Sequence, residues 1–143
     1  MMLNGWLKNT TDMETNFHFK SQICTTREQS ERLYALGLKR ETADMHHYMW
    51  SEGYLDTQAC PPRRDSQRYI PAWSLDRLRE LIPENIFTGV RNQWHRVMYN
   101  GVLTYEEGDY SLVSFRGANI YDRCISCIEW LIKEGYFNKE YLA

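Results

Sequence analysis

The sequence predicts an α+β fold in which an antiparallel sheet of about four to five strands packs against two or three helices, as a single layered sandwich. Three observations favour this class. Segments with apolar residues at helical spacing are interspersed with segments of strand-like alternation. Turn dipeptides join neighbouring strand-like segments, which makes those strands antiparallel. The 143 residues, of which 43% are hydrophobic, are enough for one core but would leave two domains marginal. We therefore assign residues 1–15 to a flexible, polar N-terminal tail and residues 16–143 to a single α+β domain.

The domain is predicted to begin with a strand and a helix. In residues 17–24, aromatic and aliphatic side chains alternate with polar ones, as in a half-buried strand. Residues 25–38 predict a helix, because Thr25 and Glu28 have the spacing of a capping box. Gly37 can adopt the left-handed backbone conformation that ends such a helix.

The next predicted strand covers residues 42–50, and its alternation divides six large side chains between two faces. One face carries Met45, His47 and Met49, and the other carries His46, Tyr48 and Trp50. Residues 51–73 form the longest irregular stretch, since Pro61 and Pro62 disfavour both helix and central strand. A loop of this length in a compact domain is mobile or functional.

A short helix and a strand meander follow the loop. Ser74 is a predicted N-cap, a leucine stripe gives the helix a buried face, and Pro83 ends it. Trp73, which precedes the cap, is expected to pack on Leu78 as a hydrophobic staple. Beyond this helix we expect two or three strands, with turn dipeptides at 100–101 and 108–109 between the strand-like segments. These segments are residues 93–100, 102–107 and 110–115.

The last helix, closed by Gly135, contains a C-x-x-C motif formed by Cys124 and Cys127. Placed at about 100° per residue, both thiols fall in the apolar arc among isoleucines and leucines. A redox pair would instead have its first thiol at the helix N-terminus. A structural zinc would need two further ligands, and the spacing to Cys24 and Cys60 matches no familiar zinc module. We predict that the pair belongs to the core, and we expect no metal site and no cofactor.

Charge and hydropathy limit the classes of partner. The formal net charge of −2 disfavours nucleic acid as a general partner, although it leaves a local basic patch open. No apolar run approaches the ~20 residues that span a bilayer. The N-terminal segment lacks the apolar stretch of a signal peptide. We expect a cytoplasmic protein with no membrane association.

Two clusters of polar residues suggest alternative chemistries. Asp44 and His46 share a face of the predicted strand, so the carboxylate could orient the imidazole of a small hydrolase that also uses a loop arginine. No nucleophile is tied to the two residues by a motif. The loop also carries Arg63, Arg64 and Arg68 next to Tyr69, a combination that could bind a nucleotide or single-stranded nucleic acid. The same residues also fit a solvated loop.

Three segments carry a resemblance to a known group. These are "TREQSERLYALGLKRETADM", "IPAWSLDRLRELIP" and "CISCIEWLIKEGYF", in that order. They resemble small uncharacterised bacterial proteins carried on prophages and other mobile elements, and they are similar to the phage sandwich domain with helix–sheet–helix layers. The likeness covers most of residues 24–137. It implies an α+β fold and a mobile-element origin, with no known activity and no catalytic residues. The Pro-Pro-Arg-Arg loop and the long N-terminal tail depart from the group.

The function that these observations favour is a non-enzymatic accessory or interaction protein. Aromatic residues make up 14% of the chain, more than a core of this size requires, and aromatic side chains dominate protein interfaces. The candidate contacts surround the long loop: Trp50, Tyr54, Tyr69 and Trp73. We expect the partner to be a protein. The oligomeric state is open, and a dimer could form by edge pairing of the strand at residues 17–24.

Overall fold

The computed structural model describes residues 21–89 and 92–143, and it confirms the α+β class with antiparallel strands. The described strands form two separate sheets, of three and four strands, instead of one sheet of four to five. The helices are α2 (Arg27–Ala35), α3 (Leu75–Leu81) and α4 (Ile120–Glu134), with short 3-10 turns at Arg40–Thr42 and Lys139–Tyr141. The predicted tail at residues 1–15 lies outside the described residues.

The first sheet has the order β2-β1-β3 and is antiparallel throughout. Its strands are β1 (Met45–Ser51), β2 (Tyr54–Gln58) and β3 (Tyr69–Ala72). The central strand β1 confirms the prediction for residues 42–50. β2 and β3 lie inside the stretch that the sequence marked as irregular, so that prediction was wrong for both ends of the stretch. Pro71 fits in β3 because this strand is at the edge, where a missing N–H costs no ladder hydrogen bond.

The second sheet has the order β4-β5-β6-β7, and it contains the predicted meander. Its strands are β4 (Asn85–Phe87), β5 (Gln93–Tyr99), β6 (Val102–Glu107) and β7 (Tyr110–Phe115). The turn between β5 and β6 places Asn100 at φ 51° and Gly101 at φ 76°. Positive φ at both central residues is typical of the tight hairpin turn that this dipeptide predicts.

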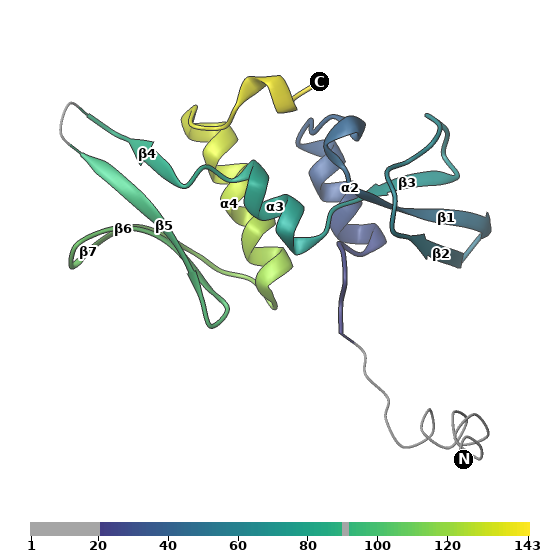
Figure 1. The fold of residues 1–143 in the computed structure, drawn as a ribbon, viewed down its shortest axis with the longest axis horizontal. Coiled ribbons are helices and arrows are strands. Elements are labelled where there is room, and N and C mark those ends of the chain that lie inside the picture. The colour runs from purple at the N-terminus through teal and green to yellow at the C-terminus, as the bar shows by residue number, and fades with distance from the viewer. Residues whose placement is uncertain (1–20, 90–91) are drawn as a thin grey trace, which may run out of the picture.

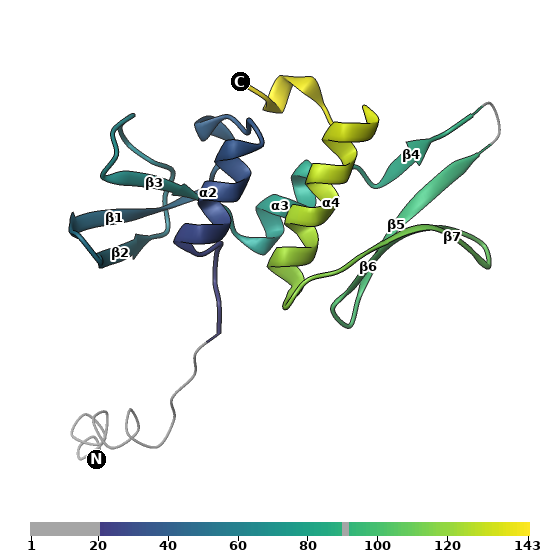
Figure 2. The same cartoon turned by 180° about the vertical axis from the view of Figure 1, so that it is seen from behind.

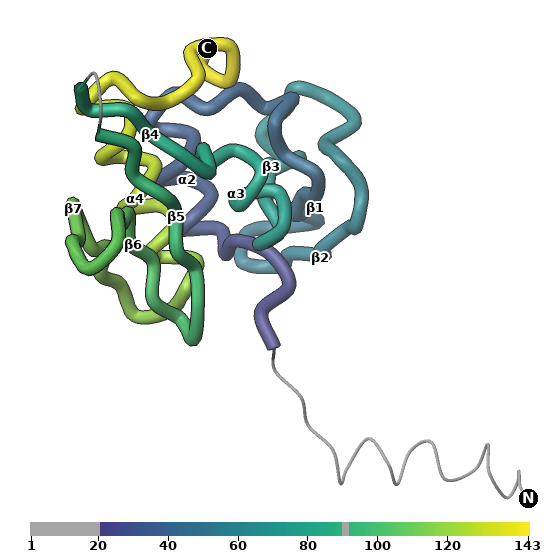
Figure 3. The backbone as a smooth tube through the Cα atoms, turned by 60° about the vertical axis from the view of Figure 1, so that its left-hand side comes forward, coloured from purple at the N-terminus to yellow at the C-terminus, as the bar shows by residue number. Residues whose placement is uncertain are grey.

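The three helices of the described residues lie between the two sheets (Figure 1). α2 contacts β3 on one side, and α4 contacts β6 and β7 on the other. α4 also packs against α2 and α3, and the view from behind shows α4 between α2 and the second sheet (Figure 2). The layer order is therefore sheet–helix–sheet, whereas the resemblance implied helix–sheet–helix. The C-terminus lies against the turn that follows α2, because the Ala143 N–H donates to the Gly37 carbonyl at 2.7 Å (Figure 3).

Two local predictions near the start of the described chain were wrong. Residues 21–24 form no strand, and the rest of the strand predicted for 17–24 lies outside the described residues. The cap of α2 is Thr26, which forms a capping box with Gln29, instead of Thr25 with Glu28. Thr25 is fully buried, and its hydroxyl accepts a hydrogen bond from the Trp73 backbone N–H at 3.1 Å. Thr25 is therefore part of the core, and Thr26 caps the helix.

The C-x-x-C pair lies in the core, as predicted. Cys124 and Cys127 have no exposed surface, and they share one cluster with the apolar face of α4 and with residues of β6. Burial raises the pKa of the Cys124 thiol to about 12, and it raises the pKa of Cys127 still further. All four cysteines of the chain are free thiols. Neither buried thiol is a nucleophile near neutral pH, since the thiolate is the reactive form.

Candidate binding site

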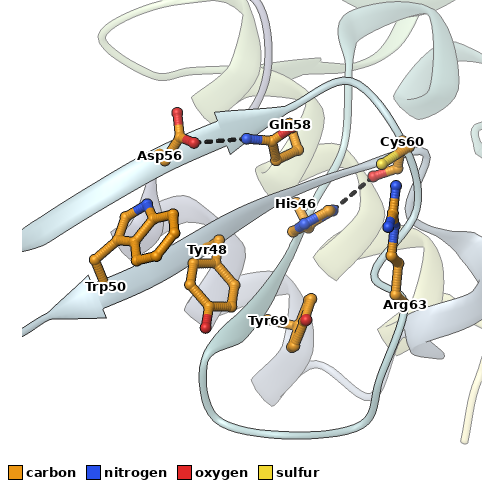
Figure 4. A pocket seen from close by; sticks show the side chains of 8 residues that line it. All are labelled: His46, Tyr48, Trp50, Asp56, Gln58, Cys60, Arg63 and Tyr69. Atoms are coloured by element: carbon orange, nitrogen blue, oxygen red, sulfur yellow. Dashed lines mark hydrogen bonds between the residues drawn. The ribbon is translucent and has the colours of Figure 1, made fainter.

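A cavity of about 270 Å³ lies on the outer face of the β1–β3 sheet, the face turned away from α2 (Figure 4). The lining residues are His46, Tyr48, Trp50, Asp56, Gln58, Cys60, Arg63 and Tyr69. We call this cavity the outer-face pocket. The alternation of β1 produces it, because successive side chains of a strand point to opposite faces. The inner face of β1 carries Met45, which packs with Cys24 and Ala72, and the buried His47, whose Nε2 donates to the Thr25 carbonyl at 2.8 Å.

Strand register aligns three of the pocket side chains in one row across the sheet. Tyr48 on β1 is paired with Asp56 on β2 and with Tyr69 on β3. Directly opposed residues in antiparallel strands have Cβ atoms roughly 5 Å apart on the same face. The row therefore runs from a carboxylate through two phenol rings. His46 and Gln58 form the next row along the same strands.

Three rings of the pocket meet nearly at right angles. The centroids of Tyr48 and Trp50 lie 4.9 Å apart with an interplanar angle of 75°. The centroids of Tyr48 and Tyr69 lie 5.0 Å apart at 72°. We call Tyr48, Trp50 and Tyr69 the aromatic corner. Edge-to-face pairs at these distances are favourable, so the corner exists before any ligand arrives.

The two ends of the pocket carry opposite charges. Asp56 is exposed, and its carboxylate accepts one hydrogen bond, from the Gln58 amide at 2.6 Å. Among the described residues Asp56 belongs to no ion pair. Arg63 lies at the opposite end, beside Cys60 (Figure 4). Asp56 and Trp50 share one end, so that end is negative and aromatic.

His46 is almost fully buried at the inner wall of the pocket. Its Nδ1 lies 2.7 Å from the Cys60 carbonyl oxygen. Since a carbonyl can only accept, Nδ1 carries the proton, and the contact fixes the ring against the long loop. The ring also packs against Tyr69, with centroids 5.4 Å apart. His46 thereby supports one wall of the aromatic corner.

The structure does not bring the predicted base–orienter pair together. Asp44 accepts hydrogen bonds from the backbone N–H and the hydroxyl of Ser74, the N-cap of α3. The bonded partner of His46 is instead a backbone carbonyl. Asp44 is therefore a capping residue, and the geometry that the hydrolase alternative requires is absent between these two residues.

Trp73 is fully buried and cannot contact a partner, which corrects its assignment as a surface residue. Its indole N–H donates to the Thr42 hydroxyl at 3.0 Å. Tyr54 is exposed at 66%, and it starts β2 opposite the end of β1. Trp50 is exposed at 60%. These two side chains are large aromatic surfaces available to a partner on the first sheet.

The three loop arginines occupy different places. Arg63 lines the outer-face pocket, and with Arg64 it also lines a second cavity of about 370 Å³ beside the two prolines. Arg68 donates from its guanidinium to the carbonyls of Met49 and Trp50, at 3.0 Å each. Arg68 therefore holds the loop onto β1, and the set does not converge on one phosphate-sized position.

Sequence reasoning missed four pocket residues: Tyr48, Asp56, Gln58 and Cys60. Tyr48 was placed on the correct face of the predicted strand but was not selected. Asp56 and Gln58 lie on β2, whose residues are mostly exposed, so no apolar alternation marks this strand in the sequence.

Comparisons with protein-family models, curated proteins and solved structures give no match for this chain. Within residues 21–89 and 92–143, no helix is both long and apolar enough to cross a membrane. In the same residues no group of three or more His, Cys, Asp or Glu side chains is placed to hold a metal ion.

Proposed function

We propose that this protein is a non-enzymatic accessory protein that binds a protein partner through the outer-face pocket and the exposed aromatic residues beside it. The aromatic corner is the observation that supports the proposal most. It offers rigid rings with few rotatable bonds, and such rings lose little entropy on binding. Trp50 is the ring with the most exposed surface of the three.

The surroundings of the corner fit an interface. Tyr54 extends the exposed aromatic surface at the hairpin between β1 and β2. Charged and polar residues border the rings on both sides, which matches the apolar centre and polar rim of protein interfaces. Interface energy concentrates in a few central aromatic and arginine side chains. The pocket contains four such residues, namely Tyr48, Trp50, Tyr69 and Arg63.

The alternatives have less support. The hydrolase hypothesis needs Asp44 to orient His46, but each of the two residues is bonded to another group. The nucleotide hypothesis needs the arginines to converge, but Arg68 is bound to backbone carbonyls. We place the interaction in the cytoplasm, where free thiols such as those of this chain persist. The resemblance to mobile-element proteins suggests that the partner belongs to a phage or its host.

Site-specific photo-crosslinking in cells tests the proposal. A benzophenone amino acid replaces Tyr54 in one variant and Tyr110 in another, and both positions are highly exposed, at 66% and 74%. Tyr110 lies on the second sheet and serves as the matched control. We expect a partner to be captured at position 54 and the capture to disappear when Trp50→Ala is added. Capture that survives Trp50→Ala, or that occurs equally at position 110, would contradict the proposal.

A further inference from the structure

The geometry of the aromatic corner indicates what kind of group it can hold. Each ring face carries negative electrostatic potential and each ring edge carries positive potential. Near-perpendicular rings at 4.9 and 5.0 Å present their faces along different directions. A compact, rounded cation can contact several such faces at once, within about 6 Å of each centroid. A flat ligand cannot do so, since it stacks on one face only.

The carboxylate of Asp56 adds a second, independent observation. It lies in the same cross-strand row as Tyr48 and Tyr69, on the outer face. Its bonded partner is an uncharged amide, and among the described residues it pairs with no cation. A cation within a few ångström of this exposed carboxylate is attracted to it, and dissolved salt screens the attraction. A cation that contacts the rings would therefore also gain from Asp56.

The positive charge in the pocket constrains the position of such a cation. Arg63 lies at the far end, near Cys60 and His46, whereas Asp56 and Trp50 lie together at the other end (Figure 4). A cation at the Trp50 end therefore avoids Arg63. Arg63 remains available to an acceptor on the same ligand, such as a backbone carbonyl or a carboxylate.

We propose that the aromatic corner, with Asp56, binds a methylated lysine side chain of the protein partner. This inference rests on the proposed function, because it names the group that the partner inserts. Methylation removes ammonium N–H donors and spreads the charge over a larger surface. A trimethylated ammonium therefore gives up less hydration than a bare one when it enters a site that offers ring faces and few acceptors. The unmethylated ammonium is more strongly hydrated and needs acceptors.

The test compares a charged probe with its neutral twin. The probe is N-acetyl-Nε-trimethyllysine methylamide, and the twin has the quaternary nitrogen replaced by carbon, which keeps the shape and removes the charge. Binding to the full chain is followed by isothermal titration calorimetry, a readout that every variant described below retains. We expect the charged probe to bind roughly fivefold or more tightly than the twin, as cation–π attraction predicts. Equal affinities, or no binding of the charged probe, would overturn the inference.

Two variants and a control refine the test. Trp50→Ala should abolish binding of the probe, and Asp56→Asn should weaken it several-fold and reduce its salt dependence. Tyr110→Ala on the second sheet should change neither the affinity for the probe nor its salt dependence. All three residues are exposed, and circular dichroism checks that each variant is folded. If Asp56→Asn binds the probe as tightly as the unmodified protein, the carboxylate is not part of the site and its assigned role is wrong.

A further arm separates the source of the ammonium group. Choline carries the same trimethylated nitrogen without the lysine backbone. We expect choline to bind more weakly than the lysine probe, because it lacks the carbonyl groups that Arg63 can contact. Tighter binding of choline would overturn the lysine assignment in favour of a small-molecule site. If none of these probes binds but a partner is still captured at position 54, this inference is wrong and the proposed function stands.

Discussion

Trp73 shows at the level of single residues how this chain uses polar atoms inside its core. Its backbone N–H donates to the Thr25 hydroxyl, and its carbonyl accepts from the Thr25 N–H at 2.9 Å. The indole N–H donates to Thr42, which itself donates to the Lys39 carbonyl. Buried polar groups of this kind must be paired, since an unpaired one keeps its full desolvation cost. The residue therefore connects α2, the turn after it and the start of α3.

Replacement of Thr42 by valine tests that role. Thr42→Val keeps the shape but leaves the indole N–H of Trp73 buried without an acceptor. We expect a loss of about 1–3 kcal/mol in the free energy of unfolding. Urea unfolding monitored by circular dichroism measures it, with Ser111→Ala on the exposed strand β7 as the control. Equal stabilities of the Thr42→Val variant and the unmodified protein would show that water reaches the indole.

The cysteines give a prediction about pH. Burial raises the pKa of Cys124 from 9.0 to about 12, and burial followed by the charge of Asp44 raises that of Cys24 to about 11. Above pH 9.0 the unfolded chain loses these protons while the folded chain keeps them. The stabilisation is therefore fully present below pH 9.0 and falls as the pH rises toward 11 and then 12.

Thermal unfolding from about pH 8 to about pH 10.5 checks this sign. We expect Tm to fall over that range, and to fall less steeply in Cys124→Ala, which lacks one of the buried thiols. In the native state at neutral pH, a thiol reagent should label Cys60 first, because it alone of the four is partly exposed. Rapid labelling of Cys124 and Cys127 would contradict the buried assignment and reopen the question of their chemistry.

At the level of elements, α3 depends on a carboxylate from outside the helix. Asp44 accepts from Ser74 at the helix N-terminus, and Ser74 in turn accepts from the Arg77 N–H at 3.1 Å. A negative charge at this end also interacts favourably with the helix dipole. Asp44 is therefore part of the capping arrangement that orients α3 against the core.

Asp44→Ala should cost about 1 kcal/mol of stability, which is typical of losing an N-cap interaction. Chemical denaturation measures the loss, and Asp76→Ala, an exposed first-turn residue of α3, serves as the comparison. The variant should leave the NMR signal of the Trp50 indole in place, because Asp44 does not line the outer-face pocket. A shift of that signal would connect Asp44 to the pocket and revive its pairing with His46.

The elements differ in how far the sequence could predict them. β1 was predictable, and its two faces could be separated in the sequence, because successive side chains of a strand point to opposite faces. β2 was not, since its residues are mostly exposed and it forms a strand by pairing with β1. Such pairing is a non-local property that no short window contains. For α2 the sequence predicted Thr25 as the N-cap instead of Thr26. Both side chains can cap a helix, and only the tertiary packing decides between them.

The candidate site was also only partly predictable, because the sequence shows the type of each residue but not its packing. Trp50, Tyr69 and Arg63 were selected from the sequence, and the structure places all three in one pocket. Trp73 was selected for its type, but tertiary packing buries it. The perpendicular arrangement of the rings depends on the register between β1 and β3, which the sequence does not state.

At the scale of the whole molecule, the helical layer separates two sheets whose outer faces differ. The first sheet has a concave aromatic pocket bordered by opposite charges. The second sheet has exposed rings, among them Tyr99 and Tyr110 at 71% and 74%. The first residues of the described chain contact α4 in the helical layer. The Asn119 side chain donates to the Gln22 amide oxygen at 3.1 Å, and the Tyr121 hydroxyl donates to the Gln22 backbone carbonyl. The first sheet, whose side chains line the pocket, lies at one end of this layered arrangement (Figure 1).

The most direct measurement is the affinity of the partner captured at position 54 for matched variants of the two faces. Calorimetric titration of that partner compares Trp50→Ala and Tyr69→Ala on the first sheet with Tyr99→Ala and Tyr110→Ala on the second. Our account predicts a loss of about tenfold or more for the first pair, as for central interface residues, and less than about twofold for the second pair. Equal losses on both faces, or a larger loss on the second sheet, would contradict it.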